Sequence, residues 1–158
     1  MSRITRMIMR FFLLLLISTL FGCASPPKTI SDFKSGEYTV RTLCSNFSVE
    51  ETHKLLLNKI AQCYQSSGET LVPAGNMLIP IGHSTYVESS VLDDDTRQIA
   101  TAVEASWNRF YQQLVEIGPS ENCSSNVYVY EFTSAWERHT QRIRDWLDGK
   151  EVSGCGVW

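Results

Sequence analysis

The sequence predicts an α+β domain in which an antiparallel β-meander carries two amphipathic helices, or three, packed on one face. Short runs rich in β-branched and aromatic residues predict the strands. Two longer segments space their apolar residues three and four apart, as amphipathic helices do. Such helices need an apolar surface to cover, and one face of an antiparallel sheet supplies it.

The first strand and the first helix are predicted near the start of this domain. Residues 38–43 are rich in Tyr, Thr and Val and predict a strand. A helix is predicted over residues 49–64, because Ser48 and Glu51 have the spacing of a capping box. Its apolar face would consist of Val49, His53, Leu56, Leu57, Ile60 and Tyr64.

Glycine and proline punctuate the segment that follows. Residues 66–82 contain three glycines and two prolines, so we expect loop and short extended pieces there. A strand is predicted over residues 84–92, and the acidic run Asp93-Asp94-Asp95 ends it.

Residues 97–117 fit two structures. As a helix, the segment has one apolar stripe; as two strands, it alternates correctly, with a turn at Asn108-Arg109. The polar face of the helix would have few charge pairs to stabilise it. Since both flanking segments look extended, a strand pair is favoured. The helical stripe would consist of Ile99, Val103, Trp107, Phe110, Leu114 and Ile117.

The last two elements are a strand and a helix. Residues 126–132 alternate valine with tyrosine and predict a strand. Ser134 and Glu137 form a second capping box, and Gly149 would end the helix that it opens. The packed side of this helix would carry Trp136, His139, Ile143, Trp146 and Leu147.

The N-terminus has the pattern of a secretory signal. Arg3, Arg6 and Arg10 occur without any acid and precede an apolar run. The stretch from Phe11 to Gly22 holds twelve uncharged residues, whereas a membrane-spanning helix needs about 20. We therefore expect a signal peptide over residues 1–22 rather than a transmembrane anchor.

The end of this signal resembles the lipobox of bacterial lipoprotein precursors. The resemblance is carried by Leu20-Phe21-Gly22-Cys23, in which Phe21 is larger than the usual residue. It covers residues 1–23 and implies cleavage before Cys23, a diacylglyceryl thioether on its sulfur and an acyl chain such as palmitate on its amine. Two or three chains anchor firmly where one binds reversibly. Ala24 implies sorting to the outer membrane, facing the periplasm; the inner membrane and the cell surface stay open.

Beyond the signal, we expect an acylated tether over residues 23–36 and one globular domain over residues 37–158. The mature part has eleven basic and seventeen acidic residues, a net charge of −6. Such a domain repels phosphate backbones, so nucleic acid is not expected as a partner. The predicted order of elements resembles the helix-grip and TATA-binding-protein-like arrangements in outline, which recur in unrelated functions.

Four cysteines besides Cys23 are the disulfide candidates: Cys44, Cys63, Cys123 and Cys155. An even number in an exported chain suggests two disulfides, with three connectivities open. We favour Cys123–Cys155, which would tie the C-terminus to a turn. Its complement, Cys44–Cys63, conflicts with the predicted helix, which would separate these residues by about 24 Å. Those two are therefore expected to be unpaired or to pair with the other cysteines.

No motif in the sequence indicates catalysis, a metal or another cofactor. His53 and His139 lie on the apolar faces of their helices and would approach each other if the helices are neighbours; a hydrogen-bonded core role is the more common one. The acidic run 93–95 lacks the spacing of a calcium loop and fits a solvated turn. Arg138, Arg142 and Arg144 would give the last helix a basic flank.

We therefore expect a non-enzymatic, membrane-anchored envelope lipoprotein. Its partners would be the membrane that holds its lipid and an envelope protein, and its role would be cell-envelope assembly or maintenance. The alternative is a lipoprotein that binds a small or lipidic ligand in a groove between sheet and helices. That groove would be lined by some of Tyr38, Trp107, Phe110 and Trp146.

Overall fold

The computed structural model describes residues 26–36, 38–74, 77–93, 95–105, 108–152 and 154–155. The predicted signal 1–22 and Cys23 lie outside these ranges, as do Asp94 and Trp107. In chain order, the elements are α2 (Ile30–Ser35), β1 (Thr39–Ser45), α3 (Val49–Tyr64), β2 (Ser66–Ala74), β3 (Met77–Val91), β4 (Arg97–Ala105), β5 (Asn108–Gly118), β6 (Ser125–Glu131), a 3₁₀ turn (Ser134–Trp136) and α4 (Glu137–Leu147).

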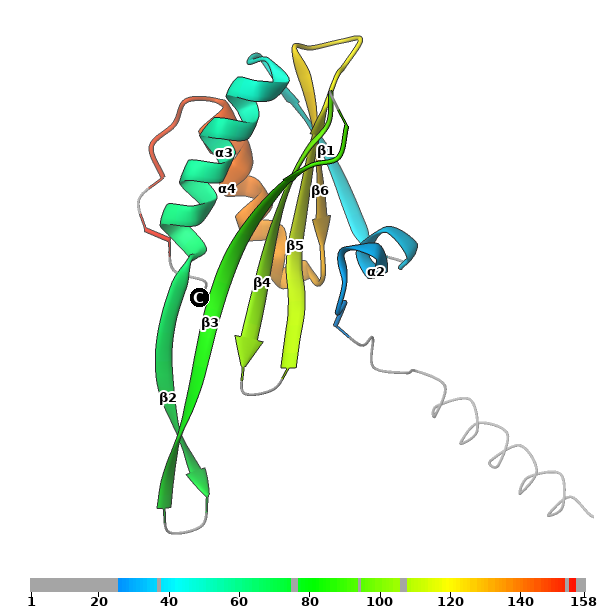
Figure 1. The fold of residues 1–158 in the computed structure, drawn as a ribbon. Coiled ribbons are helices and arrows are strands. Elements are labelled where there is room, and N and C mark those ends of the chain that lie inside the picture. Colours follow the sequence, from blue (N-terminus) through cyan, green and yellow to red (C-terminus); the bar gives the residue numbers. More distant parts are fainter. Residues whose placement is uncertain are drawn as a thin grey trace, which may run out of the picture.

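The six strands form one antiparallel sheet in the order β1-β6-β5-β4-β3-β2. Strands β2 to β6 follow one another as a meander, and β1 pairs with β6 at one edge. The predicted α+β class and antiparallel meander are confirmed. The β2–β3 hairpin projects beyond the rest of the sheet (Figure 1), because β4 pairs with β3 only from His83 onward.

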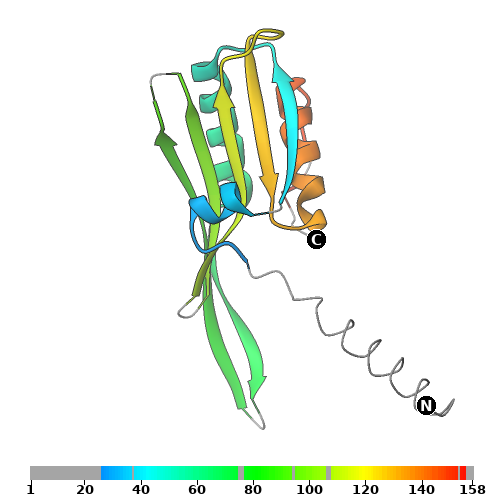
Figure 2. The same cartoon turned by 90° about the vertical axis from the view of Figure 1, so that its right-hand side faces the viewer.

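The main core lies between the sheet and the helices α3 and α4, which cover the same face (Figure 2). Both predicted apolar stripes point into this core. Leu56 and Ile60 of α3 and Ile143 of α4 are fully buried against Val127 and Val129 of β6. The helices thus cover the sheet as their periodicity predicted.

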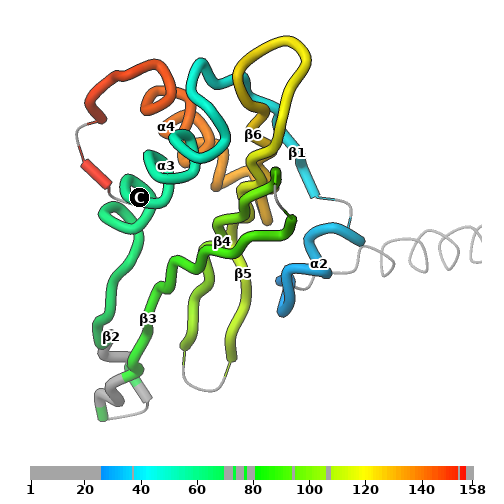
Figure 3. The backbone as a smooth tube through the Cα atoms, turned by 45° about the horizontal axis from the view of Figure 1, so that its top comes forward, coloured from blue at the N-terminus to red at the C-terminus, as the bar shows by residue number. Residues whose placement is uncertain are grey.

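A smaller core on the opposite face was not predicted. There α2 lies against the sheet (Figure 3), with Phe33 buried on Ala100 and Leu114. The carbonyl of Pro27 accepts a hydrogen bond of 2.7 Å from the backbone N–H of Tyr111. The segment 23–36, expected as a tether, is therefore packed on the domain from Pro27 onward.

The strand interpretation of residues 97–117 is confirmed. β4 and β5 pair along their length, with a register shift between Thr101 and Ala102. The connection between them falls at 106–107, before the predicted turn at Asn108-Arg109.

The loop and short extended pieces predicted over residues 66–82 are wrong, because this segment consists of β2 and the first part of β3, paired as one hairpin. Its prolines fit because β2 is an edge strand and this part of β3 has β2 alone as its neighbour. Proline removes a ladder hydrogen bond and is tolerated where a strand has a free side.

The N-terminal cap predicted for α3 is present in the structure, and the one predicted for α4 is not. α3 has the predicted bounds and capping box: Ser48 Oγ accepts from the Glu51 N–H at 3.3 Å, and Glu51 accepts from the Ser48 N–H at 3.1 Å. The second capping box is wrong, because α4 begins after a 3₁₀ turn without a side-chain cap. The Glu137 carboxylate instead binds Arg41 of β1, at 3.0 Å.

The disulfides are Cys44–Cys123 and Cys63–Cys155. The favoured Cys123–Cys155 pairing is therefore wrong, whereas the prediction of two disulfides and the exclusion of Cys44–Cys63 hold. The reason is the strand order: β1 lies beside β6, so Cys44 pairs in register with Asn126, close to the loop that carries Cys123.

Candidate functional site

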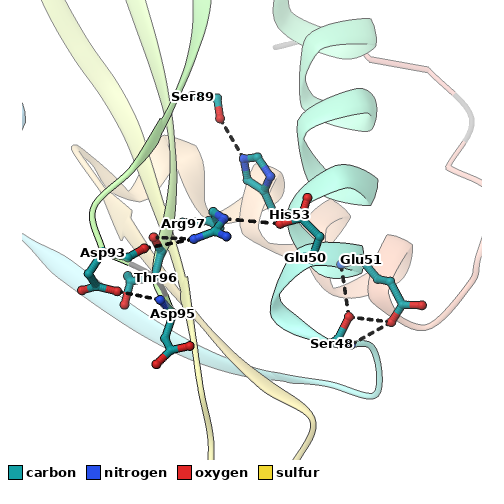
Figure 4. Close-up of polar contacts among 9 residues, drawn as sticks. All are labelled: Ser48, Glu50, Glu51, His53, Ser89, Asp93, Asp95, Thr96 and Arg97. Atoms are coloured by element: carbon teal, nitrogen blue, oxygen red, sulfur yellow. Dashed lines mark hydrogen bonds and ion pairs between the residues drawn. The ribbon is translucent and has the colours of Figure 1, made fainter.

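His53 and the acidic turn lie close together at one end of the helical face (Figure 4). The His53 Nε2 atom is 2.7 Å from the Ser89 hydroxyl of β3. One turn earlier on α3, Glu50 pairs with Arg97 of β4 at 3.4 Å. Arg97 also donates to the Asp93 carbonyl at 3.0 Å. We call these five residues the His53 cluster.

The His53 cluster does not have the arrangement of a nucleophilic triad in the described contacts. Burial lowers the pKa of His53, and Arg97 lowers it further against the opposing effect of Glu50, so the imidazole is neutral at neutral pH. A serine–histidine pair acts as nucleophile and base when a third group orients the ring. Here the Glu50 carboxylate binds Arg97 instead. The cluster fastens α3 to β3 and β4.

Two residues of the acidic run, Asp93 and Asp95, lie in the connection between β3 and β4. The Asp93 carboxylate accepts from the Asp95 N–H at 3.0 Å. Hydrogen bonds from Thr96 and Asp95 lower the pKa of Asp93, which matches an aspartate that stabilises its own turn. Among the described residues, no group of three His, Cys, Asp or Glu side chains could hold a metal ion.

His139 lies elsewhere and does not meet His53. Its ring packs against those of Tyr64 and Trp136, tilted by 37° and 35°, with centroid distances of 4.5 and 4.0 Å. Tyr64 ends α3 eleven residues after His53, about 16 Å along the helix. Burial, together with Arg142 and Arg138, lowers the pKa of His139 to about 4. This histidine is a neutral part of the core.

The predicted basic flank of α4 is not a continuous exposed surface. Arg142 is 9% exposed and donates to the Tyr64 hydroxyl at 3.2 Å. Arg138 and Arg144 are exposed. Arg142 is thus part of the core beside His139.

Of the four residues expected to line a groove, the three that the structure describes do not gather in one site. Trp146 is buried in the core under α3 and α4, whereas Tyr38 packs on Phe33 at the opposite face. Phe110 is half-buried, and Trp107 lies outside the described residues.

The sheet face opposite α3 and α4 carries a group that the sequence analysis missed. The guanidinium carbon of Arg109 lies 5.5 Å from the ring centre of Tyr86 and 5.7 Å from that of Tyr111. Glu88 accepts hydrogen bonds from Arg109 and, at 3.1 Å, from the Tyr111 hydroxyl. We call Tyr86, Glu88, Arg109 and Tyr111 the tyrosine patch.

The tyrosine patch can form because β4, the strand between its members, has small side chains at the positions that face it. Tyr86 and Glu88 lie on β3, and Arg109 and Tyr111 lie on β5, so each pair has the two-residue spacing of one sheet face. β4 separates them and presents Ala100 and Ala102 on this face. The long side chains therefore meet across β4. The two-residue spacing within each pair can be seen in the sequence, whereas the order of the strands in the sheet cannot.

The tyrosine patch combines aromatic rings with a charged pair. Burial and the Glu88 carboxylate raise the pKa of Tyr111, so its hydroxyl keeps its proton. Tyrosine and arginine are the residue types that protein interfaces favour. Beside the patch, α2, β3 and β4 border an open hollow of about 370 Å³. Its lining includes Ile30, Glu88, Ser90, Gln98 and Ala100.

No protein-family model matches the chain, and no curated protein is significantly similar to it. In the described part of the chain, every helix is too short or too polar to cross a membrane.

Proposed function

We propose that this protein is an envelope lipoprotein, held to a membrane by lipid on Cys23, that acts by binding another envelope protein rather than by catalysis. The anchor rests on the lipobox-like segment Leu20-Phe21-Gly22-Cys23 and the short apolar run before it. The outer membrane, facing the periplasm, is the proposed site, since Ala24 follows the cysteine.

The tyrosine patch is the observation that carries the proposed binding role. Tyr86 is 39% exposed on a sheet face that neither α3 nor α4 covers. Arg109 is already oriented by Glu88 and the two tyrosine rings. A side chain fixed before binding loses little conformational freedom on contact, which favours its use in recognition.

Two experiments test the two halves of this proposal. For the anchor, Cys23→Ser should release the mature chain into the soluble fraction, and intact mass of the wild type should show the acyl groups. A Cys23→Ser variant that stays membrane-bound would refute it. Density-gradient separation of the two membranes tests the outer-membrane assignment.

The binding role is tested by photo-crosslinking in intact cells. A photoreactive amino acid at Tyr86 should yield a discrete protein adduct, and Arg109→Glu should reduce its amount. The matched control position is Lys54, which is exposed on α3 at the other face of the sheet. Equal adducts from both positions, or none from Tyr86, would contradict a partner at the tyrosine patch.

A further inference from the structure

The hollow of about 370 Å³ opens on the sheet face that α2 partly covers (Figure 2). Its size falls within the range of small-molecule sites, about 300–1,000 Å³. Its lining includes an apolar residue from α2, two polar residues from β3, and one polar and one apolar residue from β4: Ile30, Glu88, Ser90, Gln98 and Ala100. The hollow therefore combines a small apolar surface with a polar rim.

Hydrogen bonds fix the direction in which Ser90 can act. The Glu116 carboxylate accepts from Gln98 Nε2 at 2.9 Å, so the amide oxygen of Gln98 points the other way. That oxygen accepts from the Ser90 hydroxyl at 3.2 Å. Because Ser90 uses its one proton on the buried Gln98, its oxygen can only accept a hydrogen bond from the hollow.

The Glu88 carboxylate is the second acceptor at the rim. It accepts from Arg109 and, at 3.1 Å, from the Tyr111 hydroxyl, and its two oxygens keep further lone pairs. Its side chain is 41% exposed. Glu88 and Ser90 have the two-residue spacing of one sheet face, about 7 Å. A ligand that bonds both therefore needs at least two donors.

The two carboxylates of this network are already balanced by cations. Arg109 pairs with Glu88, and Lys34 pairs with Glu116 at 2.5 Å. An added cation would therefore compete with a cation in place, and an anion would meet carboxylates and acceptors. A purely apolar ligand would leave Glu88 and Ser90 without the hydrogen bonds that water gives them. The ligand that fits is neutral and carries several hydroxyl groups.

We propose that this hollow binds a neutral saccharide, whose hydroxyls donate to Glu88 and Ser90 and whose C–H groups contact Ile30 and Ala100. A sugar ring has hydroxyls around its edge and C–H bonds on its faces, which suits a polar rim beside a small apolar surface. Acceptors that internal hydrogen bonds already hold lose little freedom on binding. The site shares Glu88 with the tyrosine patch and does not depend on the lipid anchor.

The test uses the mature, acylated full chain in phosphatidylcholine vesicles and saturation-transfer difference NMR, which detects weak ligands through their own signals. The probes are glucose, glucosamine and glucuronate at mildly acidic pH, because they share a ring and are neutral, cationic and anionic. We expect transfer to the ring protons of glucose, no stronger transfer to glucosamine, and severalfold weaker transfer to glucuronate.

Three variants locate the site. Ser90→Phe should abolish the transfer, because a large ring at this exposed position fills the hollow. The matched control is Val91→Phe, which should bind as the wild type does: Val91 is 63% exposed and points to the other face of β3. Ser90→Ala removes one acceptor and should weaken binding about 2–10-fold. Circular dichroism of each variant checks the fold.

Four outcomes would overturn the inference. The first is the absence of transfer to all three sugars. The second is equal transfer in Ser90→Phe and the wild type, which indicates a contact elsewhere. The third is severalfold stronger transfer to glucosamine than to glucose, which indicates a cation site at Glu88. The fourth is loss of the Tyr86 photo-adduct in Ser90→Phe without any sugar binding, which indicates a protein segment as the occupant. Failure of the proposed function is measured separately, by the adduct of the wild type and by membrane release of Cys23→Ser.

Discussion

Glu131 places a carboxylate in the core, where its side chain is fully buried. Its carboxylate is held by the Thr140 hydroxyl and by Arg41, at 3.3 Å. Arg41→Met should lower the free energy of unfolding by about 2–3 kcal/mol, because it leaves a buried charge with one neutral partner. Urea denaturation measures the change.

Two further variants separate this charge effect from lost packing. Glu131→Gln in the Arg41→Met background should restore part of the stability, since the buried charge is then gone. Glu137→Gln removes the exposed partner of Arg41 and should cost at most about 0.5 kcal/mol. Equal stability of Arg41→Met with and without Glu131→Gln would contradict the role of the charge.

The lowered pKa of His139 should make the free energy of unfolding depend on pH. Its pKa is about 4 in the folded protein, below the value of 6.5 for a free histidine. As the pH falls from 6.5 toward 4, the unfolded chain takes up a proton that the folded chain refuses, so stability is lost across this window. We expect a loss of about 3 kcal/mol from this residue.

His139→Phe keeps an aromatic ring against Tyr64 and Trp136 and cannot titrate. Its free energy of unfolding should fall less than that of the wild type between pH 6.5 and pH 4, measured by urea denaturation at each pH. Parallel curves for the two proteins would show that His139 does not bind its proton more weakly in the fold.

At the scale of elements, the end of α4 depends on one glycine. Gly149 has φ of +73°, and the N–H groups of Gly149 and Lys150 bond the carbonyls of Trp146 and Asp145, which is a Schellman motif. A β-carbon at Gly149 meets nothing within 4 Å. Gly149→Ala should therefore cost about 1 kcal/mol through backbone conformation alone.

Gly82→Ala is the matched control for this glycine. Gly82 also has open space around it, but its backbone lies outside the left-handed region. This substitution should leave the free energy of unfolding nearly unchanged or raise it slightly. Equal losses at both positions would show that φ at Gly149 is not the cause.

The elements that could be predicted are those whose signals are local. α3 was found with both ends because Ser48 and Glu51 mark its start and its stripe ends at Tyr64. The second capping box failed because Glu137 has a tertiary partner, Arg41, that the sequence does not reveal. The hairpin was missed because Pro73 and Pro80 were taken to break strands. Proline breaks a strand that is paired on both sides, and these two prolines lie where a strand is paired on one side only.

The candidate sites show the same division. His53 was placed on its helix, but its partner Ser89 follows from how α3 crosses β3. The tyrosine patch needs β3 and β5 to be separated by β4, and this neighbour relation depends on the whole sheet. The sequence thus predicts which face of a helix or strand a residue lies on. It does not predict which side chains from distant elements come into contact.

At the scale of the molecule, the disulfide Cys63–Cys155 ties the end of α3 to the C-terminal segment, across 92 residues. Replacing both cysteines with serine should lower the free energy of unfolding by about 2–4 kcal/mol, since the unfolded chain regains the freedom of a long loop. Mass analysis after alkylation should still show Cys44 and Cys123 joined. Free thiols at those two positions would contradict the pairing.

The helix α3 has a consequence for the order in which the chain matures. Cys44 and Cys63 are the first two of the paired cysteines to emerge from any channel that delivers the chain N-terminus first. Without structure between them, they would be each other's nearest oxidation partners. Once α3 has formed, its 16 residues hold its two ends about 24 Å apart, with Cys63 near one end and Cys44 before the other. A helix that forms before oxidation would therefore favour the two long-range disulfides over a local one between Cys44 and Cys63.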